Sequence, residues 1–91
     1  MIVETKHGTF ECKDITRKER RALYRKVKEV YKNENLEEIH DLAEEFALIA
    51  FENEETIEKE LGKLSALQED EVLLAIINSY MGFNNPSGVG G

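Results

Sequence analysis

The chain has 91 residues, of which 34% are charged, with a single cysteine and a formal net charge of −7. This length suits one small domain. The sequence contains no apolar run of about 18 residues, so no membrane span is expected. One cysteine can form neither an internal disulfide nor a cysteine-based metal cluster. These features favour a protein of the reducing cytoplasm.

The charge is divided along the chain. Residues 17–32 hold eight basic and two acidic side chains, whereas residues 33–73 hold two basic and fourteen acidic ones. A chain polarised in this way either pairs its two halves internally or presents opposite charges to its neighbours.

The N-terminal residues 1–13 are predicted to form a β-hairpin. Residues 2–6 and 9–13 alternate with a period of about two, and His7-Gly8 forms a two-residue loop in which glycine supplies the positive φ. An isolated hairpin is marginal in water, so we expect this one to lie on the helices. Cys12 is interpreted as a small buried hydrophobic residue.

A first helix is predicted over about 17–32. Thr16 and Glu19 have the spacing of a capping box. At 100° per residue the apolar side chains cover one arc, and the basic ones fill an adjoining arc of roughly 100°. This basic stripe consists of Arg17, Lys18, Arg21, Arg25, Lys28 and Lys32.

Two further helices are predicted over 36–52 and 54–61, with Asn35 and Asn53 as their N-caps and Gly62 after the second. The apolar residues of 36–52 cover an arc of roughly 200°, which is wider than one partner helix can cover. The opposite side of this helix is acidic.

A last helix is predicted over 66–81, from a capping box at Ser65 and Gln68 to Gly82 at the C′ position. Residues 83–91, FNNPSGVGG, are expected to form a flexible, disordered tail. The sequence therefore predicts a mainly α protein. A short N-terminal β-hairpin precedes a three- to four-helix array within a single domain, residues 1–82.

No constellation for catalysis is evident. The chain has two histidines, His7 and His40, with no Gly-x-Ser-x-Gly sequence and no calcium-loop pattern. We therefore expect a protein that is not an enzyme, with no cofactor and no metal site. The glutamate doublets are interpreted as a solvated acidic face.

The basic stripe has three interpretations. Lysine and arginine beside tyrosine suit nucleic acid, but the acidic net charge and the acidic second helix disfavour it. A membrane surface is disfavoured by the narrow apolar face of the same helix. The leading interpretation is pairing with carboxylates of this chain, within one subunit or between subunits.

The apolar arcs of the second and last helices suggest more apolar surface than a monomer of this size hides. Such a surface marks an interaction site, so a homo-oligomer and protein partners are expected. The alternative is a central helix pair that is buried within the monomer. Aromatic and methionine side chains contribute most contact energy. The predicted apolar partner-binding residues are Phe46, Leu48, Phe51, Tyr80, Met81 and Phe83.

The order of these segments resembles the tail assembly chaperones of long-tailed bacteriophages. The likeness lies in the hairpin ending "GTFECKDIT", the basic helix "RKERRALYRKV", the acidic and apolar helix "EEIHDLAEEFALIAF", the short "NEETIEKEL" and the terminal "EDEVLLAIINSYMGF". The resemblance implies a protein of the host cytoplasm that keeps the tape measure protein soluble and recruits tail tube subunits. The alternatives are a small nucleic-acid-binding regulator using the helix 17–32, and a structural virion or connector protein.

Overall fold

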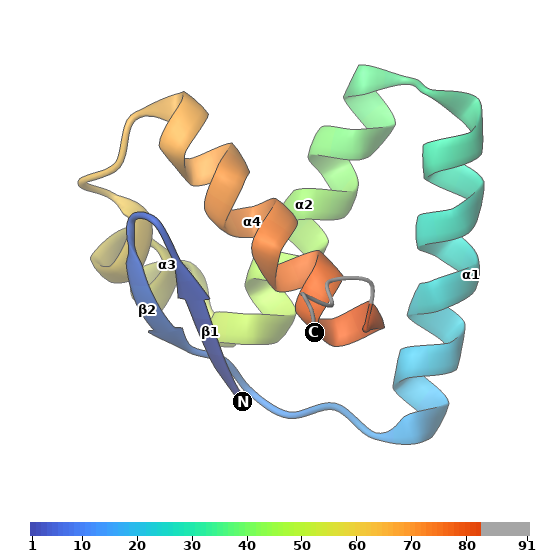
Figure 1. The fold of residues 1–91 in the computed structure, drawn as a ribbon, viewed down its shortest axis with the longest axis horizontal. Helices are drawn as coiled ribbons and strands as arrows, with labels where there is room; N and C mark the ends of the chain where they lie inside the picture. The colour runs from blue at the N-terminus through green and yellow to red at the C-terminus, as the bar shows by residue number, and fades with distance from the viewer. Residues whose placement is uncertain (83–91) are drawn as a thin grey trace.

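The computed structural model describes residues 1–82 as a β-hairpin followed by four helices (Figure 1). The elements are β1 (Ile2–Thr5), β2 (Gly8–Glu11), α1 (Arg17–Asn33), α2 (Leu36–Phe51), α3 (Glu54–Leu61) and α4 (Ala66–Met81). The predicted mainly α fold with an N-terminal hairpin is thus confirmed. The predicted tail 83–91, including Phe83, lies outside the described residues.

The four helix starts agree with the predicted caps. Thr16 and Ser65 each form a complete capping box. The hydroxyl of each cap accepts from the backbone N–H three residues later, and the side chain of that residue, Glu19 or Gln68, accepts from the backbone N–H of the cap. The side chains of the two asparagine caps, Asn35 and Asn53, accept hydrogen bonds from the backbone N–H three residues later. These bonds satisfy donors that the first helical turn leaves unpaired, so the starts follow from local sequence.

The ends of α1 and α2 differ slightly from the prediction. α1 continues to Asn33 and stops at Glu34 with φ 52°, and α2 stops at Phe51 because Glu52 has φ 73°. At both C-caps a non-glycine residue adopts the left-handed conformation. The usual sequence signal for such a helix end is glycine, so these two ends could not be located from that signal. Gly82, with φ 75°, ends α4 as predicted.

The turn of the hairpin is shifted by one residue from the prediction. Thr5 pairs with Gly8, so Lys6-His7 form the loop and Gly8 opens β2 with the expected positive φ of 132°. The Thr5 hydroxyl donates to the Gly8 carbonyl and accepts from the His7 N–H, and these two bonds stabilise the turn. Val3 faces Phe10 across the ladder, and both are buried.

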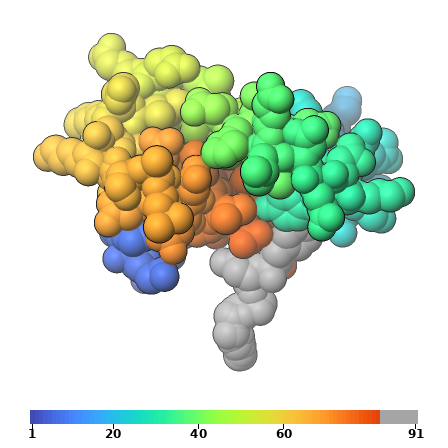
Figure 2. Space-filling view, turned by 90° about the horizontal axis from the view of Figure 1, so that it is seen from above, coloured from blue at the N-terminus to red at the C-terminus, as the bar shows by residue number. Residues whose placement is uncertain are grey.

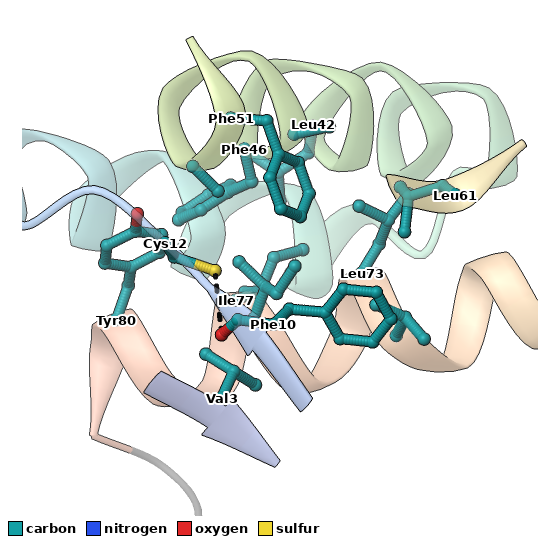
Figure 3. Packing of buried hydrophobic residues seen from close by; sticks show 14 of the residues in the cluster. Val3, Phe10, Cys12, Leu42, Phe46, Phe51, Leu61, Leu73, Ile77 and Tyr80 are labelled. Atoms are coloured by element: carbon teal, nitrogen blue, oxygen red, sulfur yellow. Dashed lines mark hydrogen bonds between the residues drawn. The ribbon is translucent and has the colours of Figure 1, made fainter. Parts of the chain in front are cut away.

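The core lies between the hairpin, α2 and α4. In Figure 1 α4 crosses the molecule with α2 beside it, while the hairpin and α3 lie toward one end. The aromatic rings of Phe10 and Phe51 meet edge to face at 6.4 Å, and those of Phe46 and Tyr80 lie 5.8 Å apart (Figure 3). Among residues 1–82, sixteen hydrophobic residues are buried in one cluster. Their burial provides most of the favourable free energy of folding.

The helix α1 stands at the edge of the molecule. Val27 is its one buried residue, and most of its other side chains are exposed. Polar side-chain contacts to α4 and α2 hold it in place. The Arg20 guanidinium donates to the carbonyls of Tyr80 and Met81 at 2.9 and 3.0 Å, and the Lys26 ammonium pairs with Glu45 at 2.5 Å.

The segment after β2 joins three parts of the fold. The Lys13 N–H donates to the Ala50 carbonyl at 2.9 Å, at the end of α2, and the Lys13 carbonyl accepts from the Tyr80 hydroxyl of α4. The N-terminal amino group donates to the Cys12 carbonyl at 2.9 Å and pairs with Asp14 at 3.0 Å. The hairpin is therefore tied to both core helices.

Comparison of two tyrosines, Tyr80 and Tyr31, tests this tie. The Tyr80 hydroxyl is hydrogen-bonded, whereas the buried Tyr31 hydroxyl has no hydrogen-bond partner among residues 1–82. Tyr80→Phe should therefore lower the free energy of unfolding by about 1–1.5 kcal/mol, and Tyr31→Phe should leave it unchanged or slightly higher. Urea unfolding at constant m value measures both. Equal losses in the two variants would contradict the assignment.

Candidate macromolecule-binding surfaces

Most of the predicted apolar anchors lie inside the protein. Phe46, Phe51, Tyr80 and Met81 are each at most 5% exposed, so predicting them as an accessible partner surface is wrong. The reason is that α2 and α4 pack on each other and the hairpin covers α4, with Phe10 against Phe51. The wide apolar arcs of α2 and α4 are thus covered by several other elements of the same subunit. Leu48 is 41% exposed and stays a predicted contact residue, but it does not line the groove between α2 and α4 that is described below.

The predicted basic stripe forms an exposed face of α1. All six side chains, called here the basic face, are exposed, and none makes an ion pair within residues 1–82. They are Arg17, Lys18, Arg21, Arg25, Lys28 and Lys32. The interpretation that the stripe meets carboxylates of its own subunit is therefore wrong for these six. Lys26, on another side of the helix, makes the contact with α2 instead.

A shallow hollow of about 330 Å³ lies on this part of α1. It is lined by Arg20, Arg21, Tyr24, Arg25 and Lys28, and the Tyr24 side chain is 42% exposed. An aromatic ring among guanidinium and ammonium groups can contact an anionic partner by both charge and stacking.

A second hollow lies between α2 and α4, and sequence reasoning did not predict it. This apolar groove has a volume of about 140 Å³ and is lined by Leu36, Ile39, His40, Ala43, Asp70, Leu74 and Ile77. Figure 2 shows the green side chains of α2 beside the orange ones of α4. Leu36 is 73% exposed and Leu74 43%, so each presents much of its side chain to solvent.

Carboxylates gather beside this groove. Partial burial raises the pKa of Glu69, and the nearby carboxylates of Glu44, Asp70 and Glu58 raise it further. These four residues, called here the acidic cluster, come from α2, α3 and α4. The acidic residues of each helix are visible in the sequence, but their closeness in space depends on how the helices cross.

The acidic cluster makes a testable contribution to stability. A carboxyl group whose pKa is higher in the folded than in the unfolded protein destabilises the fold once it ionises, so the cost is present at neutral pH and disappears on acidification. Glu69→Gln should therefore raise the free energy of unfolding near pH 7 by about 0.5 kcal/mol. The gain should vanish below the pKa of an ordinary glutamate. Urea unfolding at both pH values measures it, and a loss of stability near neutrality would contradict it.

A histidine–carboxylate contact connects the hairpin turn to α4. The His7 Nε2 atom lies 2.8 Å from Glu71 Oε1, and Lys6 Nζ lies 3.4 Å from the other oxygen. The hydrogen bond to His7, with that to Lys6, lowers the pKa of Glu71. Since 64 residues separate His7 from Glu71, no local pattern predicted this pair. Its position gives it a structural role in holding the turn against α4.

The chemistry-bearing residues are otherwise dispersed. Cys12 is 2% exposed, so the prediction of a small buried residue is confirmed, and burial raises the pKa of its thiol to about 11. Within residues 1–82, no group of three His, Cys, Asp or Glu side chains is placed to hold a metal ion. None of the helices in this range is long and apolar enough to cross a membrane.

Comparison with known proteins returned no relative. No family model, no curated protein and no solved structure matches the chain. The features that point to a function are therefore the two surfaces just described, the basic face and the groove with its acidic cluster.

Proposed function

We propose that this protein is a non-catalytic, protein-binding assembly factor that holds an amphipathic helix of a client in the groove between α2 and α4. The observation that carries the proposal is the combination of exposed leucines in an apolar groove with an adjacent acidic cluster. A helix binds such a groove through apolar side chains spaced three and four residues apart. The acidic cluster adds a preference for lysine or arginine beside them.

This proposal is compatible with the chaperone type that the sequence resembles. In that setting the client is the tape measure protein, the later partners are tail tube subunits, and the site of action is the host cytoplasm. The buried aromatic residues stabilise the chaperone itself, and the client contacts fall to Leu36 and Leu74. Leu67 lies two helical turns before Leu74 and is 71% exposed, so it extends the apolar row along α4.

The groove is tested with a synthetic amphipathic helix of leucine and lysine, titrated against the full chain by isothermal calorimetry. Leu74→Ser should weaken binding about fivefold to tenfold, the loss expected for one partly buried leucine. Leu48→Ser is the matched control, because Leu48 has nearly the same exposure but does not line the groove. A leucine and glutamate helix should bind far more weakly.

Two results would contradict the proposal. One is absence of binding by the leucine and lysine helix. The other is an equal loss of affinity in the Leu48 and Leu74 variants, which would place the contact elsewhere.

A second candidate is binding of nucleic acid by the basic face. Six cations that make no ion pair within the described residues 1–82, beside a half-exposed Tyr24, favour it. Such binding would depend steeply on salt, because phosphate contacts release counterions. Fluorescence anisotropy with a labelled single-stranded oligonucleotide tests it. Affinity lost on Arg21→Glu with Arg25→Glu supports this function, and no binding at low salt excludes it.

A further inference from the structure

The molecule carries two surfaces of opposite character that do not meet within one subunit. The basic face lies on an exposed side of α1, within a segment of net charge +6. The groove lies between α2 and α4, beside the acidic cluster. Each is one half of an electrostatically complementary pair.

Helix α2 separates these two surfaces. On the side toward α1, Glu38, Asp41 and Glu45 line a hollow shared with Lys26. On the side toward α4, Leu36 and the other α2 residues of the groove face away from that contact. The charges of α1 that face its own α2 are thus already matched by the Lys26–Glu45 pair, while the basic face is directed outward.

We infer that the basic face of one copy of this chain docks against the groove and acidic cluster of a second copy. Arg21 and Arg25 lie one helical turn apart on α1, and the Tyr24 ring beside them is 42% exposed. The ring meets Leu36 and Leu74 of the partner copy, while the guanidinium groups meet its Glu44 and Asp70. This inference rests on the proposed function, since it uses the same groove.

The contact joins different surfaces of two identical subunits. Contacts of this heterologous kind form a ring where the rotation closes, and an open chain where it does not. Self-association also covers the exposed leucines of the groove in the absence of a client. A client helix with basic flanks then competes with α1 of the neighbouring copy, so binding of a client and self-association exclude each other at any one groove.

Charge reversal on each surface tests the contact in the full chain. Nuclease-treated protein is examined by sedimentation velocity at about 0.05 M and about 0.5 M salt, because charge pairing at a surface weakens as the screening length shortens. We expect the wild type to associate at low salt and to dissociate largely at high salt. Arg21→Glu with Arg25→Glu should be monomeric, and Glu44→Lys with Asp70→Lys should be monomeric as well.

Mixing the two double variants gives the decisive result. Each variant repels itself, but the reversed basic face of one complements the reversed acidic cluster of the other, and the two unmodified surfaces still match. An equimolar mixture should therefore regain the association of the wild type. Circular dichroism of each variant confirms that it is folded. Lys63→Glu is the control for general loss of positive charge, since Lys63 is exposed, lies outside α1 and makes no ion pair within residues 1–82.

The possible failures are distinguishable. A wild type that is monomeric at low salt, or a mixture that stays monomeric, overturns the inference about self-association. If the leucine and lysine helix still binds the groove in that case, the proposed function stands. If oligonucleotide binding alone requires Arg21 and Arg25, the occupant of the basic face is nucleic acid, and a second copy is excluded.

Discussion

Phe46→Ala is expected to lower the free energy of unfolding by about 3–5 kcal/mol, the usual cost of emptying a buried phenylalanine site. Phe46 has no exposed surface, and its ring lies 5.8 Å from that of Tyr80, so its removal takes contacts from both core helices. Domains of this size have a total stability of about 5–15 kcal/mol. The variant should therefore be partly unfolded at moderate temperature, with a large drop in the urea midpoint.

Leu48→Ala is the matched control, two residues along the same helix. Its side chain is 41% exposed, so the expected change is within about 0.5 kcal/mol. The comparison also tests whether Phe46 is a core residue or a partner-binding residue. If Phe46→Ala kept the stability of the wild type but lost binding of the leucine and lysine helix, Phe46 would be a contact residue after all, and the assignment to the core would be wrong.

The helix starts could be predicted because their causes are local. A Thr or Ser with Glu or Gln three residues later, or an Asn before a helical stretch, satisfies backbone donors within four residues of chain. The shifted hairpin turn has a different cause. Gly8 supplies the positive φ at the start of β2, and the bonds of the Thr5 hydroxyl close the loop at Lys6-His7. That choice depends on cross-strand register, which residue types alone leave open.

Burial of the apolar arcs depends on how many neighbours each helix has. The sequence indicates the width of the arc on α2, but not that α4 packs beside it or that Phe10 reaches Phe51 from the hairpin. For the same reason Phe46 and Phe51 were predicted at the surface. The basic face, by contrast, follows from helical periodicity on one helix and from the exposure of that helix.

The groove and the acidic cluster could be recognised only from the tertiary structure. Glu44 and Glu69 lie on different helices, and their mutual repulsion exists only because α2 and α4 cross beside each other. Exposed leucines such as Leu36 were visible in sequence as members of an apolar arc. Only the crossing shows that Leu36 and Leu74 share one hollow.

Arg20→Met is expected to cost about 2 kcal/mol, because hydrogen bonds from a charged group to helix carbonyls are among the stronger ones. The Arg20 guanidinium donates to the Tyr80 and Met81 carbonyls, which the end of α4 otherwise leaves unpaired. Methionine keeps the apolar stem of the side chain, so the loss reports mainly these two bonds. Urea unfolding measures the change, and amide hydrogen exchange should show faster opening in the last turn of α4.

Arg21→Met provides the control at the adjacent position. Arg21 belongs to the basic face and makes no ion pair within residues 1–82, so its loss should change stability by less than about 0.5 kcal/mol. It should instead weaken self-association at low salt, an effect that the Arg20 variant shows only to the extent that it unfolds. Two neighbouring arginines of one helix would then separate the fold from the binding surface. Equal losses of stability in both variants would show that α1 is held by its overall charge rather than by the contact of Arg20 with α4.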